Sequence, residues 1–144
     1  MERLMPKLNK LSIIDVSTLI VIALFLTIGV VYYNYRPVPI STRLIVTVHI
    51  GDPIISKAIL AQAQADKQVF LDSVDQQLDV QGVKEVLDTT GQLSALDIIL
   101  KGPGYIDVNG NYIFNGQRVL INQKAEIHGN YFAAGAIAKV ENAN

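Results

Sequence analysis

VSTLIVIALFLTIGVVYYNY, residues 16–35, sets the architecture of this chain. Its 20 residues contain no formal charge and no proline. A helix of about 20 residues is about 30 Å long, which matches the hydrocarbon core of a bilayer. The stretch therefore predicts one transmembrane helix, over residues 12–35. The residues predicted to form this membrane anchor are Val16, Leu19, Ile20, Ala23, Leu24, Thr27, Tyr32, Tyr33 and Tyr35.

Both ends of the stretch carry helix-boundary signals. Ser12 and Asp15 have the spacing of a capping box, in which each side chain bonds a backbone amide of the first turn. At the other end, the three tyrosines predict an aromatic belt at the membrane–water interface. Pro37, directly after Arg36, stops the helix.

Two other interpretations of the stretch are weaker. A cleaved signal peptide has a shorter apolar region that ends in small residues, whereas this one ends in Tyr-Tyr-Asn-Tyr-Arg-Pro. A buried core helix needs a domain large enough to surround it, and 144 residues are too few. We therefore expect a retained anchor.

The positive charges near the membrane predict an orientation. Arg3, Lys7 and Lys10 precede the helix together with the α-amino group, and only Arg36 and Arg43 follow it closely. Because Lys and Arg are enriched on the cytoplasmic side, residues 1–11 are predicted to form a cytoplasmic tail. The C-terminal domain is then extracytoplasmic or lumenal.

The chain beyond the anchor predicts a spacer over residues 36–42, stiffened by two prolines, and a β-rich domain over residues 43–141. The domain opens with a strand over 43–50 and a helix over 54–67. Asp52 and Pro53 suit the start of that helix. Its apolar residues recur every four positions, at Ile55, Ile59 and Ala63, and predict a stripe that packs on a sheet.

The rest of the domain predicts short strands separated by turns. Asn109-Gly110 and Asn115-Gly116 favour tight hairpin turns because Asn and Gly accept positive φ angles. Gly102-Pro103-Gly104 predicts another turn, and Gly135 a bulge or a barrel corner. Residues 68–71 fit either a strand or the end of the helix. The predicted strands are 80–87, 93–100, 105–108, 112–114, 117–121, 125–128 and 131–140.

Together these elements predict a small mainly-β (α+β) domain. About eight short strands with one helix favour a closed or half-closed β barrel with the helix covering an opening, because closure removes exposed strand edges.

Composition and motifs argue against several kinds of site. The chain has no cysteine, which excludes disulfides, thiolate metal sites and a cysteine nucleophile. Beyond residue 36 it has eight Lys and Arg against eleven Asp and Glu, which argues against nucleic-acid binding. Ser56, Ser73 and Ser94 lie in no nucleophile motif, and the glycines of 102–104 form no phosphate loop. We expect no catalytic residue, no cofactor and no small-molecule substrate.

Three groups of side chains are candidates for a site, each with a plainer explanation. His49 and His128 would bind a metal only if the fold brought them together. Asp72, Asp75 and Asp79 would share one face of a helix, but their spacing is not that of a calcium loop. The aromatic residues suggest either a stacking platform or, more simply, packing within the sheet; they are Tyr105, Tyr112, Phe114, Tyr131 and Phe132.

Three pieces of the sequence resemble an uncharacterised family of bacterial single-pass membrane proteins, domain of unknown function 4330, found in cyanobacteria and Gram-positive bacteria. They are LSIID at Leu11–Asp15, the strand and proline-capped helix at Arg43–Ile59, and a C-terminal run that includes Gly102-Pro103-Gly104, YIFNGQ at Tyr112–Gln117, Val119 and 135–140. The chain departs from the family where Asn122 replaces a usual glycine, and over the longer, more polar 62–77. The resemblance implies the bacterial cytoplasmic membrane, or the thylakoid membrane in a cyanobacterium.

A looser resemblance is to mammalian-cell-entry lipid-transport proteins, which place a small β barrel after one N-terminal helix and form rings. The long apolar pore loop of those proteins is missing here.

The functional expectation is a non-catalytic, membrane-anchored accessory or assembly subunit of a larger bacterial membrane protein complex. Its expected partners are membrane lipid and integral membrane proteins, with Ala23, Thr27 and Gly29 as a face for packing against other helices. The alternative is a lipid- or ligand-binding β-barrel module that forms a homo-oligomer. An enzyme is the third possibility.

Overall fold

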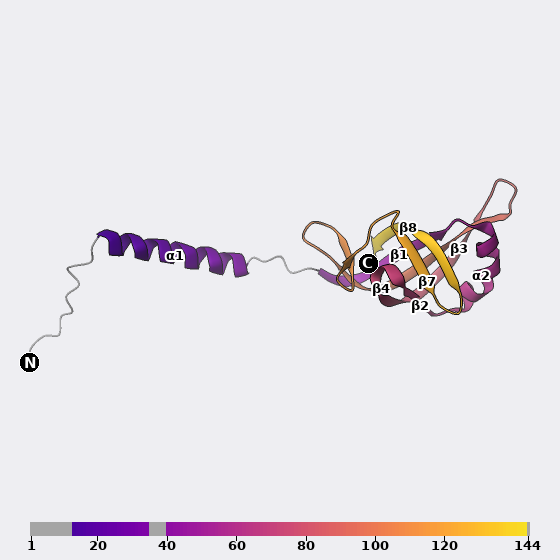
Figure 1. Ribbon diagram of the computed structural model, residues 1–144, viewed down its shortest axis with the longest axis horizontal. Helices are drawn as coiled ribbons and strands as arrows, with labels where there is room; N and C mark the ends of the chain where they lie inside the picture. The colour runs from indigo at the N-terminus through magenta and orange to yellow at the C-terminus, as the bar shows by residue number, and fades with distance from the viewer. Residues whose placement is uncertain (1–12, 35–39, 144) are drawn as a thin grey trace, which may run out of the picture. The chain divides into compact units, whose positions relative to one another are not determined.

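The computed structural model describes residues 13–34 and 40–143, and it divides the chain into two compact units, Met1–Val38 and Pro39–Asn144 (Figure 1). Several features predicted from the sequence lie outside the described residues. They are the tail 1–11 with its basic residues, the capping residue Ser12, Tyr35, and residues 36–39 of the spacer.

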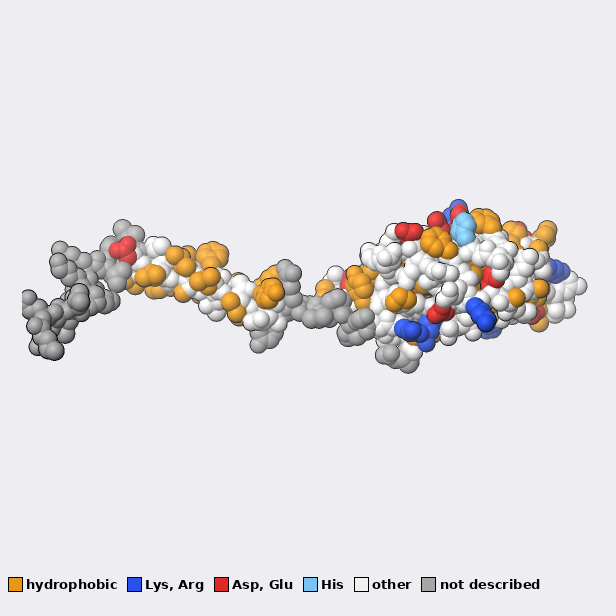
Figure 2. Space-filling view, turned by 90° about the horizontal axis from the view of Figure 1, so that it is seen from below, with side chains coloured by type: hydrophobic (Ala, Val, Ile, Leu, Met, Phe, Trp, Pro, Cys, Tyr) orange, Lys and Arg blue, Asp and Glu red, His pale blue; other side chains and the backbone are white. Residues whose placement is uncertain are grey.

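The first unit contains the helix α1 (Ile13–Asn34). From Asp15 to Asn34 every side chain is exposed, and this segment is long and apolar enough to cross a membrane by length and composition. The hydroxyl of Thr27 is hydrogen-bonded within the helix, since Oγ1 donates to the carbonyl oxygen of Ala23 at 2.8 Å. Figure 2 shows hydrophobic side chains all along this helix.

The second unit is a mainly-β domain with one longer helix, which confirms the predicted α+β class. Its described elements are β1 (Ile40–Ile50), α2 (Pro53–Ala65), β2 (Gln68–Leu71), the short 3₁₀ helix η1 (Asp72–Val74), β3 (Gln76–Leu87), β4 (Leu93–Ile106), β5 (Tyr112–Phe114), β6 (Gln117–Arg118), β7 (Lys124–His128) and β8 (Phe132–Asn142). Residues 68–71, left open by the sequence, form a strand.

The strand pairings form a ring. β1 pairs with β8 on one edge and with β4 on the other. From β8 the pairings continue through β7, β2 and β3 back to β4, and the hairpin of β5 and β6 extends from β4. All of these pairings are antiparallel.

The core lies inside this ring because side chains alternate along each strand. In β1, Leu44, Val46, Val48 and Ile50 are fully buried, and the residues between them are half-buried. β4 contributes Leu96, Ile98 and Leu100 in the same way, and Phe114 of β5 is also fully buried. The interior is therefore filled by branched aliphatic side chains.

The helix α2 lies at one end of the domain (Figure 1). Asp52 caps it, accepting from the backbone nitrogens of Ile54 at 2.8 Å and Ile55 at 3.1 Å. The predicted stripe is wrong by one residue, because Ile55 is 37% exposed and Ser56 is buried beside Ile59 and Ala63. The buried residues Ser56, Ile59 and Ala63 are separated by three and then four residues, which follows the 3.6-residue period of a helix more closely than two separations of four. The Ser56 hydroxyl donates to the carbonyl of Ile50 at 3.1 Å, so its burial leaves no polar group unpaired.

Gly102-Pro103-Gly104 is not a turn, contrary to the prediction, because β4 runs through it without a break. The glycines permit close packing instead. A Cβ on Gly102 would overlap the side chain of Leu78, and one on Gly104 would lie 2.7 Å from the side chain of Leu44. Local sequence cannot distinguish this use of glycine from a turn.

Pro103 is tolerated in this strand because its nitrogen faces an unpaired edge. The backbone nitrogen of Asp107 donates to the carbonyl of Asn111 at 2.9 Å. Backbone polar groups of alternate residues point to the same edge of a strand, so those of every second residue before Asp107 point to the edge of β4 on which β5 lies. Pro103 is one of these residues. On this edge β3 pairs with β4 as far as Lys101 and β5 pairs from Tyr105 onward, so neither strand pairs with Pro103, which is opposite Arg43 of β1 on the other edge.

The turns around β5 differ from each other. Asn115 and Gly116 both have positive φ, 46° and 77°, as a two-residue hairpin turn requires. At Asn109-Gly110 only Gly110 does, because the loop is organised by Asp107, whose carboxylate accepts from the backbone nitrogens of Asn109 and Asn111 at 2.8 Å each.

Asn122 also has positive φ, 67°. Asn is the residue that best replaces Gly in this region of backbone space. The departure from the resembled family at this position is therefore one that the backbone accepts.

Candidate functional site

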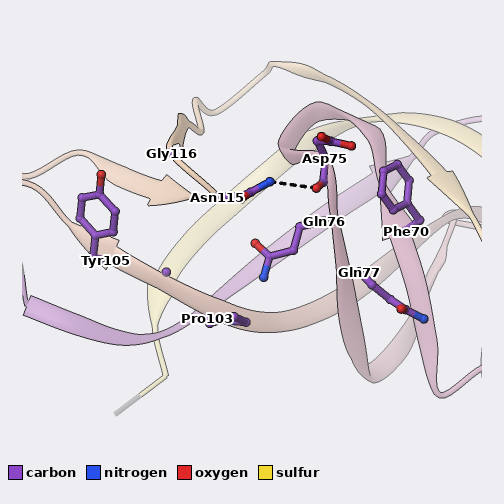
Figure 3. A pocket seen from close by; sticks show the side chains of 9 residues that line it. Phe70, Asp75, Gln76, Gln77, Pro103, Tyr105, Asn115 and Gly116 are labelled. Carbon is purple, nitrogen blue, oxygen red and sulfur yellow. Dashed lines mark hydrogen bonds between the residues drawn. The ribbon is translucent and has the colours of Figure 1, made fainter.

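An open groove lies where the pairing of β4 is interrupted, beside Pro103 (Figure 3). Its volume is about 750 Å³. Phe70 of β2 and Tyr105 of β4 lie on opposite sides of it, and the side chain of Gln76 lies between them (Figure 3). The groove thus combines aromatic walls with a polar centre.

Two residues with unusual backbone conformations form the rim of this groove. Asp75 and Asn115 both have positive φ, 49° and 46°, which is uncommon for residues other than glycine. The side-chain Nδ2 of Asn115 donates to the backbone carbonyl of Asp75 at 3.0 Å, which joins the start of β3 to the β5–β6 turn. Conformations of this kind persist where surrounding contacts hold them, and they are frequent at binding sites.

Gln76 brings an incompletely bonded polar group to the groove. Its Oε1 is buried and has no hydrogen-bond partner among the described residues. An unsatisfied buried acceptor costs about 1–3 kcal/mol. Rotation of this amide toward a hydrogen-bond donor in the groove would remove that cost.

A ladder of exposed rings crosses three strands next to the groove. Phe70 of β2 is the cross-strand partner of His128 in β7, which in turn is the partner of Phe132 in β8. The ring centroids are 6.4 Å apart for Phe70 and His128 and 5.0 Å for His128 and Phe132, both in edge-to-face geometry. Phe132 is 57% exposed, so the ladder is an apolar feature of the surface.

The two histidines have separate partners. His128 belongs to the aromatic ladder, and His49 places Nδ1 2.7 Å from Oδ1 of Asp97 in the neighbouring strand β4. Over residues 13–34 and 40–143, no group of three or more His, Cys, Asp or Glu side chains is placed to hold a metal ion.

The three aspartates do not share a helix face. Asp72 opens η1, Asp75 follows η1 in the left-handed conformation, and Asp79 lies in β3. Asp79 accepts from the side chain of Gln68 at 2.8 Å. Spacing by three and four residues aligns side chains only within a continuous helix, and the chain here changes element twice.

The predicted anchor residues that the structure describes lie on α1, with exposed side chains. Gly29 does not share a face with Ala23 and Thr27, because six residues at 100° each carry it to another side of the helix. It lies in a hollow of about 400 Å³ between larger side chains, among them Phe25 and Tyr33.

Sequence reasoning assigned the aromatic residues to packing, which holds for some of them. Phe114 and Tyr131 are buried in the core, and Tyr105 and Tyr112 are half-buried. Phe132 is exposed. Neither the groove nor the ladder was predicted from the sequence. Phe70 and Gln76 are separated along the chain by about 30 to 60 residues from the residues of β4, the β5–β6 turn and β7 that they meet in these two features. The Asn115-Gly116 turn was the one local signal at this place.

Comparison with protein-family models, with curated proteins and with solved structures finds no match for this chain.

Proposed function

We propose that the chain is a non-catalytic, membrane-anchored accessory or assembly subunit of a larger bacterial membrane protein complex. In this proposal α1 spans the cytoplasmic membrane, or the thylakoid membrane, with the N-terminus in the cytoplasm. The observation that carries it is the helix itself: from Asp15 to Asn34 it is apolar, long enough for a bilayer and exposed along its whole length. Lipid and neighbouring helices are the surroundings that suit such a surface.

The hollow at Gly29 supports a helical partner within the membrane. Apart from the chain neighbours and the backbone of the helix itself, nothing lies within 4 Å of the place where a Cβ would be, and the side chains that line the hollow include Phe25 and Tyr33. In lipid, helices associate through close packing at small residues, so a ridge of a partner helix would fit against this position.

The aromatic ladder supports docking by the β domain. Exposed Phe side chains beside each other are depleted on surfaces that face only water and enriched in protein interfaces. Phe132 lies at one end of the ladder and outside the groove, which makes it the position at which docking can be tested alone.

We also propose that the ring of strands is a small half-closed β barrel with a packed interior. The pairing of β1 with both β4 and β8 supports this form. The fully buried side chains of Leu44, Ile98 and Ile137 favour a docking scaffold over a barrel that carries lipid. We further propose that the chain belongs to the bacterial family known as domain of unknown function 4330.

Purification from native membranes in mild detergent tests the function. We expect the tagged full-length chain to bring down integral membrane proteins at constant ratio. Phe132→Ser should weaken this association at least about tenfold, since burying a Phe side chain is worth roughly 1.5–3 kcal/mol.

Gln64→Ser, on the exposed face of α2, is the matched control and should leave the association unchanged. Recovery of the wild-type chain as a lone monomer at every expression level would contradict the proposal.

A further inference from the structure

We propose that the groove beside Pro103 is a binding site for neutral sugar rings of a glycan, a role separate from docking through the aromatic ladder. The first step of the argument concerns charge. Among the described residues that line the groove, Asp75 is the one that carries a charge at neutral pH, and that charge is negative. A groove lined in this way repels phosphates and other anions, which bind where Lys, Arg or helix N-termini converge.

The second step concerns hydrogen bonding. Gln76 and Asn115 bring side-chain amides to the groove (Figure 3). A primary amide offers both donors and an acceptor, and a sugar hydroxyl offers the same combination in return. The Oε1 of Gln76 has no partner among the described residues, so rotation of this amide toward a bound hydroxyl would satisfy it.

The third step concerns the apolar surfaces. Phe70 and Tyr105 face the groove from two sides, with Pro103 at its base (Figure 3). The C–H face of a pyranose ring is apolar and its rim carries hydroxyls, so it can lie against an aromatic ring while the amides bond its edge. A volume of about 750 Å³ lies within the usual range of ligand sites, and an open groove suits a chain of rings.

The main competing ligand is an extended peptide that would add a strand to β4. Such a peptide needs alternating N–H and C=O groups on a free strand edge. Between Lys101 and Tyr105 the residue facing that edge is Pro103, which has no N–H. The backbone of the groove therefore disfavours a peptide strand, and the side chains favour sugars.

Isothermal titration of the full-length chain in lipid nanodiscs tests this proposal. Sugar-headed detergents must be avoided, because they would compete. The probes are cellotriose and triacetylchitotriose, with glucose 6-phosphate and an unstructured Gly-Ser hexapeptide as comparison ligands. We expect saturable binding of at least one trisaccharide, with a Kd on the order of 0.1–1 mM, and no binding of the comparison ligands.

The variants separate the groove from the ladder. Tyr105→Ala should weaken trisaccharide binding about tenfold, and Gln76→Ala about threefold or more, while Phe132→Ala should leave it within about twofold. Gln76→Ala removes an unsatisfied group, so it retains the fold even if Tyr105→Ala does not. Neither groove variant should change co-purification of membrane partners.

Absence of saturable binding by both trisaccharides at about 10 mM would overturn the proposal. So would binding of the peptide alone, or equal loss of sugar binding in the Phe132 variant. A failed titration with intact co-purification would leave the docking function standing, and the reverse result would remove docking alone.

Discussion

Asp66 joins the end of α2 to the turn between β7 and β8. Its carboxylate accepts from the backbone nitrogen of Asn130 at 3.0 Å and from the side-chain Nδ2 of the same residue. Gly129 leaves room for this arrangement, because a Cβ there would overlap the Asp66 carboxylate. One buried carboxylate therefore fixes a turn more than 60 residues away along the chain.

Tyr131, next to this turn, has an unusual phenol. Its side chain is 8% exposed, and its hydroxyl has no hydrogen-bond partner among the described residues. Burial, with a smaller effect from the negative charge of Asp66, raises the pKa of Tyr131 from 10.0 to about 12. The fold therefore favours the neutral phenol.

We predict that Tyr131→Phe is at least as stable as the wild type at neutral pH, by up to about 1 kcal/mol, because it removes a buried unpaired hydroxyl. Because the pKa of this phenol is higher in the folded than in the unfolded protein, its ionisation has no effect on stability below pH 10, and the folded state loses stability as the pH rises from 10 toward 12. The variant should therefore lose less stability than the wild type above pH 10.

Urea unfolding of the full chain at several pH values between neutral and alkaline measures this difference. Tyr112→Phe, at a half-buried position, is the control for loss of a phenol. If the Tyr131 variant followed the alkaline decline of the wild type in full, the phenol would not be the group responsible.

At the scale of elements, two strand glycines offer a matched comparison. Gly135 in β8 lies against β1, and a Cβ there would overlap the backbone carbonyl of His49. Gly82 in β3 has nothing within 4 Å of the same position. Neither has a positive φ, so the two positions differ in space and not in backbone strain.

We predict that Gly135→Ala destabilises the domain by about 2–4 kcal/mol, because strand backbones must separate to accept the methyl group. Gly82→Ala should change stability by less than about 1 kcal/mol, and it can gain from the lower entropy of the unfolded chain. Denaturant unfolding of the two variants measures both changes in the free energy of unfolding, and we expect its dependence on denaturant concentration to be the same as for the wild type. Equal effects would mean that the contact between β8 and β1 is looser than described.

The elements themselves were largely predictable, because each depends on neighbours in sequence. Alternation of Val46, Val48 and Ile50 predicts a strand over 43–50, within the observed β1, and Asp52 before Pro53 predicts the start of α2. The failure at Gly102-Pro103-Gly104 has a different origin. The same three residues suit a turn and a strand pressed against Leu78 and Leu44, and only tertiary contacts decide between them.

At the scale of the whole molecule, the least predictable features are those made by long-range pairing. β1 contacts β4 about 50 residues later and β8 about 90 residues later, and no local period carries that information. The groove arises from the same pairings, since it lies where β3 has left β4 and β5 has not begun. The long apolar helix α1 was predictable because a membrane-spanning length without charged residues is met within one continuous segment.

The proposed membrane orientation rests on the basic residues within positions 1–11, and it can be tested because the chain contains no cysteine. Thr89 is exposed in the turn between β3 and β4, where the side chain of Asp88 bonds Thr90 and Gln92 but not Thr89. Thr89→Cys therefore adds one accessible thiol to the β domain and keeps the hydrogen bonds of the Asp88 side chain to Thr90 and Gln92. Asn9→Cys, which precedes the helix in the sequence, is the matched variant.

We predict that a membrane-impermeant maleimide labels the Thr89 variant in intact cells and the Asn9 variant only after permeabilisation. The reason is the excess of Lys and Arg before the helix, which retains the N-terminus in the cytoplasm. The reverse pattern would place the β domain in the cytoplasm, and the aromatic ladder and the groove would then face cytoplasmic partners. Labelling of both variants in intact cells would show instead that α1 does not hold the two thiols on opposite sides of a membrane.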